Sequence, residues 1–222
     1  MTEFDGRFKR LADAPDIVVV NNYKCGFSSS NLLRYHDVTE LGSEDTVIFF
    51  YRDVVLRAVS VFINWCITDE RYATGDSWLL DNLRRHRGDD AHRAFLQLFD
   101  RSRHDEAFAI YAAALDAIAS WNEHTRPQVE ILRTYDIDAG RIDHFVELER
   151  SAEFTRLTGL DFPYDRTNES DGEVKRSLIR LLIDEPSLPA ELERVYRADR
   201  EFFAEHGLTT VRWQDLGRAT TR

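Results

Sequence analysis

Short apolar runs alternate with longer amphipathic stretches along this chain of 222 residues. The run from Val47 to Tyr51 is apolar without alternation, which is typical of a strand buried on both faces of a parallel sheet. The runs that predict strands are residues 16–22, 46–52, 128–133 and 144–148. Because helical patterns separate them, the sequence predicts an α/β fold with a central parallel β-sheet flanked by helices. We expect the first two of these strands to be neighbours.

Helical patterns occupy the middle of the chain and its C-terminal part. Between residues 77 and 124, apolar side chains recur at three- and four-residue spacing with charged residues between them. Ser187 and Pro189 indicate the start of a C-terminal helix, and Gly207 indicates its end. Neither a repeat nor a linker rich in proline, glycine or serine divides the chain, so we expect a single domain covering residues 1–222.

The net charge, the lengths of the apolar runs and the cysteine content limit which partners and which compartment we expect. The formal net charge of -11 disfavours binding to nucleic acid or to an anionic membrane, so an anionic ligand has to meet a local positive pocket. No run approaches the roughly 18 apolar residues of a membrane span, and residues 1–10 lack the apolar core of a signal peptide. We therefore expect a cytoplasmic protein. In that compartment we expect Cys25 and Cys66 to be thiols rather than a disulfide.

The segment Asn-Asn-Tyr-Lys-Cys-Gly-Phe-Ser-Ser-Ser, residues 21–30, follows the first predicted strand directly. The residues after it, 31–35, predict the start of a helix. A strand that leads through a glycine into a hydroxyl-rich helix N-terminus is suited to hold a phosphate or sulfate, because backbone N–H groups and the helix dipole point at the anion. Lys24 adds a full positive charge, in a chain that otherwise uses arginine almost throughout.

A second anion motif starts where the second predicted strand ends. Arg52 would project from the carboxyl end of that strand, where ligands collect in open α/β sheets, and Ser60 lies about two helical turns further on. A guanidinium and a hydroxyl placed in this way can hold a second phosphate. The alternative is that Arg52 pairs with Asp53 or another acid and that Ser60 is an ordinary helix residue.

Together the two motifs resemble those of the sulfotransferase superfamily. Residues 23–29 resemble the family's 5′-phosphosulfate loop, Pro-Lys-x-Gly-x-Thr-Ser, and residues 52–60 resemble its 3′-phosphate motif, Arg-Asp-Pro-x-x-Arg-x-x-Ser. Tyr23 and Val54 replace prolines of these motifs, and Ser28 replaces the threonine but keeps a hydroxyl. Because prolines shape the backbone and donate no hydrogen bond, these departures do not exclude ligand binding.

Three later segments resemble the carbohydrate-type branch of that family and occur in the family's order. Residues 122–128 contain a His-x-Arg-Pro-Gln sequence. Residues 142–149, followed by Phe154, resemble a strand that ends in Leu-Glu before a helix, and residues 166–170 resemble an Asn-x-Ser segment. The matches therefore extend from residue 16 to about residue 170.

The resemblance implies a P-loop-like sulfotransferase fold with a helical middle region and C-terminal helices. It also implies that the donor is 3′-phosphoadenosine 5′-phosphosulfate (PAPS), that the nucleotide product is adenosine 3′,5′-bisphosphate, and that no metal is needed. The acceptor would be a hydroxyl of a carbohydrate or small molecule. The donor-binding residues implied by the motifs are Lys24, Cys25, Gly26, Phe27, Ser28, Ser29, Ser30, Arg52 and Ser60.

Sulfuryl transfer requires aligned reactants, stabilisation of charge on the leaving oxygen, and a base for the acceptor hydroxyl. Lys24 is the candidate for charge stabilisation. His124 is the leading candidate for the base, since it belongs to the His-x-Arg-Pro-Gln segment. His36, which the pattern places at the end of the helix after the loop, is the second candidate. Glu123 and Glu70 are carboxylate alternatives.

Two other functions stay open on the sequence alone. A P-loop-like small-molecule kinase is disfavoured because the lysine precedes the glycine and no Gly-x-x-x-x-Gly-Lys-Ser/Thr sequence is present. A non-catalytic nucleotide-binding protein would keep the fold without the reaction. For an enzyme, we expect the helical residues 67–122 to build most of the wall around the acceptor.

Overall fold

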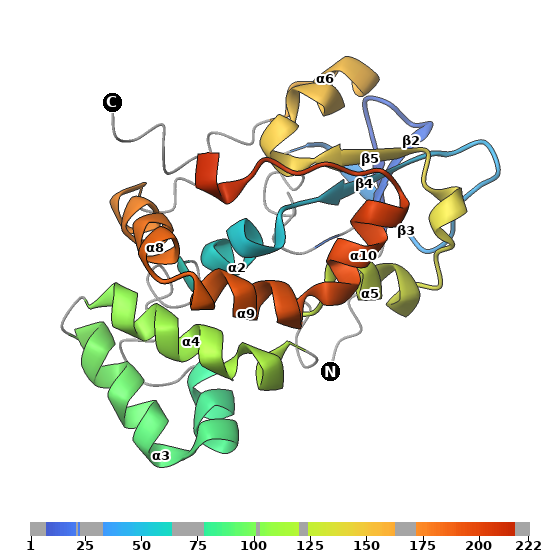
Figure 1. Ribbon diagram of the computed structural model, residues 1–222. Coiled ribbons are helices and arrows are strands. Elements are labelled where there is room, and N and C mark those ends of the chain that lie inside the picture. The colour runs from blue at the N-terminus through green and yellow to red at the C-terminus, as the bar shows by residue number, and fades with distance from the viewer. Residues whose placement is uncertain are drawn as a thin grey trace. The chain divides into compact units, whose positions relative to one another are not determined.

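A computed structural model (Figure 1) describes residues 8–20, 22, 33–63, 78–100, 103–119, 124–162 and 172–215. The chain divides into two compact units. The first comprises residues 1–52, 128–169 and 203–210, and the second comprises residues 53–127, 170–202 and 211–222. The expectation of a single domain stays a prediction.

The described part of the first unit contains a five-stranded mixed sheet with the order β3-β1-β2-β4-β5. Its strands are β1 (Phe8–Leu11), β2 (Ile17–Val20), β3 (Tyr35–Val38), β4 (Thr46–Tyr51) and β5 (His144–Glu147). β4 pairs in parallel with both β2 and β5, whereas β1 pairs antiparallel with β2 and β3. The predicted α/β class and the neighbouring first two strands are therefore confirmed, but the sheet is not purely parallel.

Two predictions of secondary structure are wrong. The predicted strand at 128–133 is part of the helix α5 (Gln128–Thr134), because its buried positions, 128, 129, 131 and 132, share one helical face instead of alternating. The predicted helix start at 31–35 is contradicted at Tyr35, which begins strand β3. Strands β1 and β3 were not predicted at all, since Lys9 and Arg10 interrupt one apolar pattern and β3 is mostly polar.

Helical segments cover both faces of the sheet in the first unit (Figure 1). On one face, Phe50 of β4 stacks on Phe162 at 4.8 Å between ring centroids, and Phe154 of α6 (Ala152–Thr158) packs against both rings. On the other face, Phe8 of β1 meets Tyr135, just after α5, edge to face at 6.3 Å. Two short 3₁₀ turns, Ala139–Arg141 and Leu148–Arg150, flank β5.

Lys9 is buried in this sheet, with 3% of its surface exposed, and its ammonium lies 4.6 Å from the centre of the Tyr35 ring. Burial lowers the pKa of Lys9 to about 8, although the Asp37 carboxylate opposes that shift. Below pH 8 the folded protein therefore bears the full cost of burying the charge, and this cost is relieved as the pH rises towards 10.5, the ordinary lysine pKa.

Replacing Lys9 with methionine is expected to raise the free energy of unfolding by about 1 to 2 kcal/mol at pH 7, because a buried charge is exchanged for an apolar chain of similar length. The difference in free energy of unfolding between this variant and wild type should become smaller between pH 8 and pH 10, because Lys9 of the folded wild type loses its charge there. Urea denaturation of both proteins at pH 7 and pH 10 measures the difference. A gain that does not change with pH, or a loss at pH 7, would contradict this account of Lys9.

Asp45 anchors the turn before β4 through several hydrogen bonds. Arg10 donates from Nη1 and Nη2 to the two carboxylate oxygens of Asp45, at 2.5 and 2.7 Å, and the Gly42 N–H donates to Oδ2 at 2.7 Å. The hydrogen bonds from Arg10 are the main reason that the pKa of Asp45 is lowered. The stabilisation is therefore fully present above the ordinary pKa of 3.8 and is lost as the pH falls below it.

Asp45→Asn is expected to lower the free energy of unfolding by about 1 to 2 kcal/mol at pH 7, because it removes the charge from a partly buried bidentate pair. The exposed neighbour Glu44 offers a matched control, and Glu44→Gln should change stability by less than about 0.5 kcal/mol. Guanidine denaturation from pH 7 to pH 3 tests the idea. If the ion pair is the cause, the difference in free energy of unfolding between Asp45→Asn and wild type will diminish towards pH 3. A difference that stays constant down to pH 3 would contradict this explanation.

The second unit is helical in its described part. Its helices are α2 (Val54–Ile63), α3 (Trp78–Asp100), α4 (His104–Ile118), α8 (Gly172–Asp184) and α9 (Ser187–Val195), and α10 (Arg197–Glu205) begins there. α2 and α4 both pack against α8 and α9, and α3 lies beside α4 (Figure 1). Every residue of α2 except the half-buried Ser60 is buried, and within the unit α2 contacts both α8 and α9.

The helical predictions for the middle and the C-terminal part are confirmed in the described residues. α3 and α4 occupy the middle, with a break inside α3 at Gly88, whose φ of 82° is a conformation that glycine adopts readily. The predicted C-terminal helix is divided at Tyr196 into α9 and α10, and Gly207, with a φ of 64°, follows as predicted.

Candidate functional site

The chain leaves β2 and β4 at the same end of the sheet, because the two strands are adjacent and parallel. Their register pairs Val20, the last residue of β2, with Phe49, and Arg52 directly follows β4. Beyond the end of β2, the side-chain amide of Asn22 donates a hydrogen bond to the Phe50 carbonyl oxygen at 2.7 Å. This bond holds Asn22, two residues beyond the end of β2, against strand β4.

The guanidinium of Arg52 is held by a carboxylate from the end of β5. Arg52 Nε donates to Glu149 Oε1 at 2.6 Å, and the two side chains are only 5% and 11% exposed. Glu149 lies in the short 3₁₀ turn after β5, so both residues extend from the carboxyl ends of neighbouring parallel strands. The sequence-based alternative that Arg52 pairs with an acid is thus observed, and that acid is Glu149.

The backbone of Arg52 is held as well, by the side chain of Gln128. Gln128 Oε1 accepts a hydrogen bond from the Arg52 N–H at 2.9 Å, and Gln128 Nε2 donates to the Arg52 carbonyl oxygen at 2.8 Å. Gln128 is fully buried at the start of α5. Its amide thereby replaces the hydrogen bonds that a further strand would make, a role that sequence reasoning missed.

The two residues of the expected 3′-phosphate site fall in different units. Arg52 is the last residue of that part of the first unit, and Ser60 lies in α2 of the second. Between them, Asp53 Oδ1 accepts hydrogen bonds from the N–H groups of Val55 and Leu56, both at 3.0 Å. Asp53 therefore caps the N-terminus of α2 and starts the helix directly after the strand end.

Arg57, the second arginine of the Arg-Asp-Pro-x-x-Arg-x-x-Ser pattern, is 1% exposed inside the second unit. Its Nη1 donates to the Arg126 carbonyl oxygen at 2.7 Å, and its guanidinium carbon lies 5.8 Å from the centre of the Tyr196 ring. Arg57 thus fastens the segment 124–127 to α2. Within that segment Thr125 is fully buried and His124 is half-buried.

The candidate bases have different positions. His124 lies in the turn that precedes α5. His36 is exposed in strand β3, at the edge of the described sheet, and lies opposite Arg10 in the register of β3 with β1. The placement of His36 at the end of a helix is therefore wrong. The carboxylate alternatives Glu70 and Glu123 lie outside the described residues.

Several other predicted features also lie outside the described residues. They are the donor-loop residues Lys24, Cys25, Gly26, Phe27, Ser28, Ser29 and Ser30, together with Cys66 and the segment 166–170. Their roles stay predictions. Among the described residues, no group of three or more histidine, cysteine, aspartate or glutamate side chains could hold a metal ion, and no helix is long and apolar enough to cross a membrane.

No protein-family model, curated protein or solved structure matches this chain.

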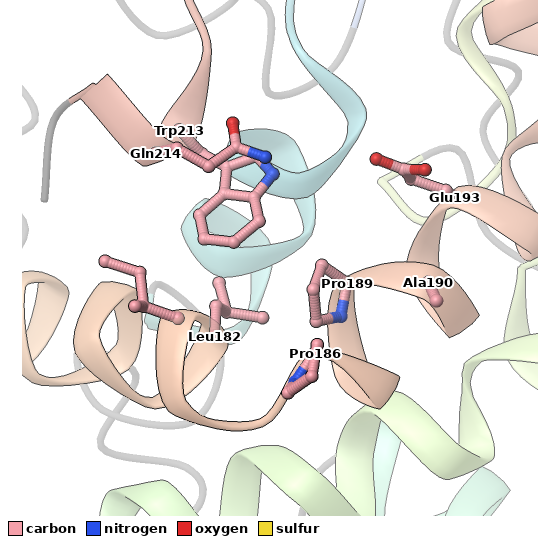
Figure 2. A pocket seen from close by; sticks show the side chains of 8 residues that line it. Leu182, Pro186, Pro189, Ala190, Glu193, Trp213 and Gln214 are labelled. Carbon is pink, nitrogen blue, oxygen red and sulfur yellow. The ribbon is translucent and has the colours of Figure 1, made fainter.

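A cavity of about 440 Å³ lies in the second unit, and none of the residues that the motifs single out is among its lining residues. Figure 2 shows the Trp213 indole facing Leu182 of α8 and Pro189 of α9. Glu193 and Gln214 contribute the polar groups of its lining, and Glu193 is paired with Arg200. All eight lining residues lie between positions 182 and 214, and the expectation that residues 67–122 build the acceptor wall stays a prediction.

Proposed function

We propose that this protein is a sulfotransferase that moves a sulfuryl group from PAPS to a hydroxyl of a carbohydrate or small-molecule acceptor. The observation that carries the proposal is the adjacency of β2 and β4 in parallel. Each strand is followed directly by one of the two anion motifs, so both motifs begin at the carboxyl end of the sheet. A donor with two separate phosphate groups suits two neighbouring anion motifs.

In this proposal the loop 24–30 binds the 5′-phosphosulfate through backbone N–H groups, serine hydroxyls and Lys24. Arg52 and Ser60 bind the 3′-phosphate. The acceptor oxygen attacks the sulfur atom while the bond between sulfur and the bridging phosphate oxygen breaks. His124 takes the proton of the hydroxyl, Lys24 stabilises the charge that grows on the leaving oxygen, and adenosine 3′,5′-bisphosphate departs.

Binding and transfer assays on the full chain test the proposal. Isothermal titration calorimetry compares adenosine 3′,5′-bisphosphate with ATP and magnesium, and radiolabelled PAPS is then incubated with the protein and a metabolite or glycan extract. We expect the bisphosphate to bind more tightly than ATP and label to appear in an extract component. Preference for ATP and magnesium would favour a kinase instead, and bisphosphate binding without transfer across a broad set of acceptors would favour a non-catalytic protein.

A further inference from the structure

We propose that Glu149 is a positioning residue for the 3′-phosphate site, and that its contact with Arg52 sets the preference for nucleotides that carry a 3′-phosphate. This inference rests on the proposed function, because it assigns Arg52 to that phosphate. Glu149 itself, as a carboxylate, would not contact the phosphate. Its role would be to orient the arginine that does.

The contact determines the orientation of the whole guanidinium. Glu149 Oε1 accepts the hydrogen bond from Arg52 Nε at 2.6 Å. The five N–H donors of an arginine lie in one plane, so a contact at Nε constrains the direction of the others. With side chains only 5% and 11% exposed, water competes little for this hydrogen bond.

The backbone contacts of Gln128 complete the restraint. Gln128 holds both the N–H and the carbonyl oxygen of Arg52, at 2.9 and 2.8 Å. Arg52 is therefore restrained at its peptide groups by α5 and at its side chain by the turn after β5. A long, flexible side chain loses much of its rotamer freedom when it is ordered by a ligand, and here that loss has already occurred on folding.

The charge of Glu149 reduces the non-directional attraction between Arg52 and anions. A carboxylate beside Arg52 offsets the positive charge, so the pair attracts anions in general less than an isolated arginine would. The remaining attraction depends on directed hydrogen bonds to an anion in the right place. Orientation, rather than net charge, would then distinguish a nucleotide with a 3′-phosphate from one without it.

Two substitutions separate orientation from charge. Glu149→Gln keeps the length of the side chain and an oxygen that can accept from Nε, but it removes the charge. Glu149→Asp keeps the charge but withdraws the carboxylate by one methylene, which breaks the 2.6 Å contact or displaces the guanidinium. Glu153, a more exposed glutamate on α6, provides the matched controls Glu153→Gln and Glu153→Asp.

The measurement is the ratio of the dissociation constants of adenosine 5′-monophosphate and adenosine 3′,5′-bisphosphate, determined by calorimetry for the full chain. We expect wild type to prefer the bisphosphate by about tenfold or more, because a charge-assisted phosphate contact accounts for at least that difference. Glu149→Gln and both Glu153 controls should keep the ratio within about threefold of the wild-type value. Glu149→Asp should lower the ratio by about tenfold. The thermal midpoint of unfolding is measured for every variant to show that each one is folded.

The possible failures are distinguishable. If wild type prefers the bisphosphate but Glu149→Asp keeps that preference, the inference about Glu149 is overturned and the proposed function survives. If Glu149→Gln changes the ratio and Glu149→Asp does not, charge rather than orientation is responsible, which also overturns the inference. A wild-type protein that binds both nucleotides equally would instead contradict the assignment of a 3′-phosphate site, and with it the proposed function.

Discussion

Sulfuryl transfer by the Lys24→Ala variant is expected to be slower than wild-type transfer by a factor of about 10² to 10³. Lys24 is predicted to face the oxygen on which negative charge develops as the sulfuryl group leaves. Removing one such donor typically raises the barrier by about 3 to 4 kcal/mol. Binding of adenosine 3′,5′-bisphosphate should weaken less than transfer does, because the charge stabilised by Lys24 is largest in the transition state.

The measurement is kcat with labelled PAPS and a saturating acceptor, together with a circular dichroism spectrum that reports the fold. Lys175→Ala is the matched control, since Lys175 is a lysine in α8, far from the donor motifs in the sequence. This control should keep wild-type activity. A folded Lys24→Ala protein with activity near that of wild type would rule out Lys24 as the stabilising group.

Arg57→Ala is expected to lower the free energy of unfolding by about 3 to 5 kcal/mol. The residue is 1% exposed, so the substitution leaves a cavity beside α2. It also removes the donor that bonds the Arg126 carbonyl oxygen at 2.7 Å, and the cation over the Tyr196 ring. A loss of this size is a large part of the stability of an ordinary domain.

Urea denaturation at pH 7 measures the loss, and two variants make its cause identifiable. Arg57→Met keeps much of the side-chain volume and removes only the polar contacts, so it should be less destabilising than Arg57→Ala. Arg180→Ala removes an exposed arginine from α8 and should change stability by less than about 0.5 kcal/mol. If Arg57→Ala lowered the free energy of unfolding by no more than Arg180→Ala does, the contact between Arg57 and the segment 124–127 would not stabilise the protein.

Hydrophobic pattern predicted the elements that are apolar over their whole length. Strand β4 is such a run, and its parallel pairing with β2 agrees with the prediction, although strand β3 instead of a helix occupies residues 35–38 between them. The pattern failed for β1 and β3, because Lys9 of β1 is buried beside the Tyr35 ring of β3, Arg10 bonds Asp45, and the middle residues of β3 are exposed. It also failed for 128–133, where a strand was predicted although the buried residues are spaced as in a helix.

Local sequence was sufficient to propose the two anion motifs, because the residues of each motif directly follow a predicted strand along the chain. It was not sufficient to identify what holds Arg52. Glu149 is 97 positions away from Arg52 and Gln128 is 76 positions away, and a contact over such a distance depends on how β4, β5 and α5 pack. A buried guanidinium requires a hydrogen-bonding partner, but spacing in the sequence does not show which residue that will be. The tertiary packing of β4, β5 and α5 determines which side chain lies close enough.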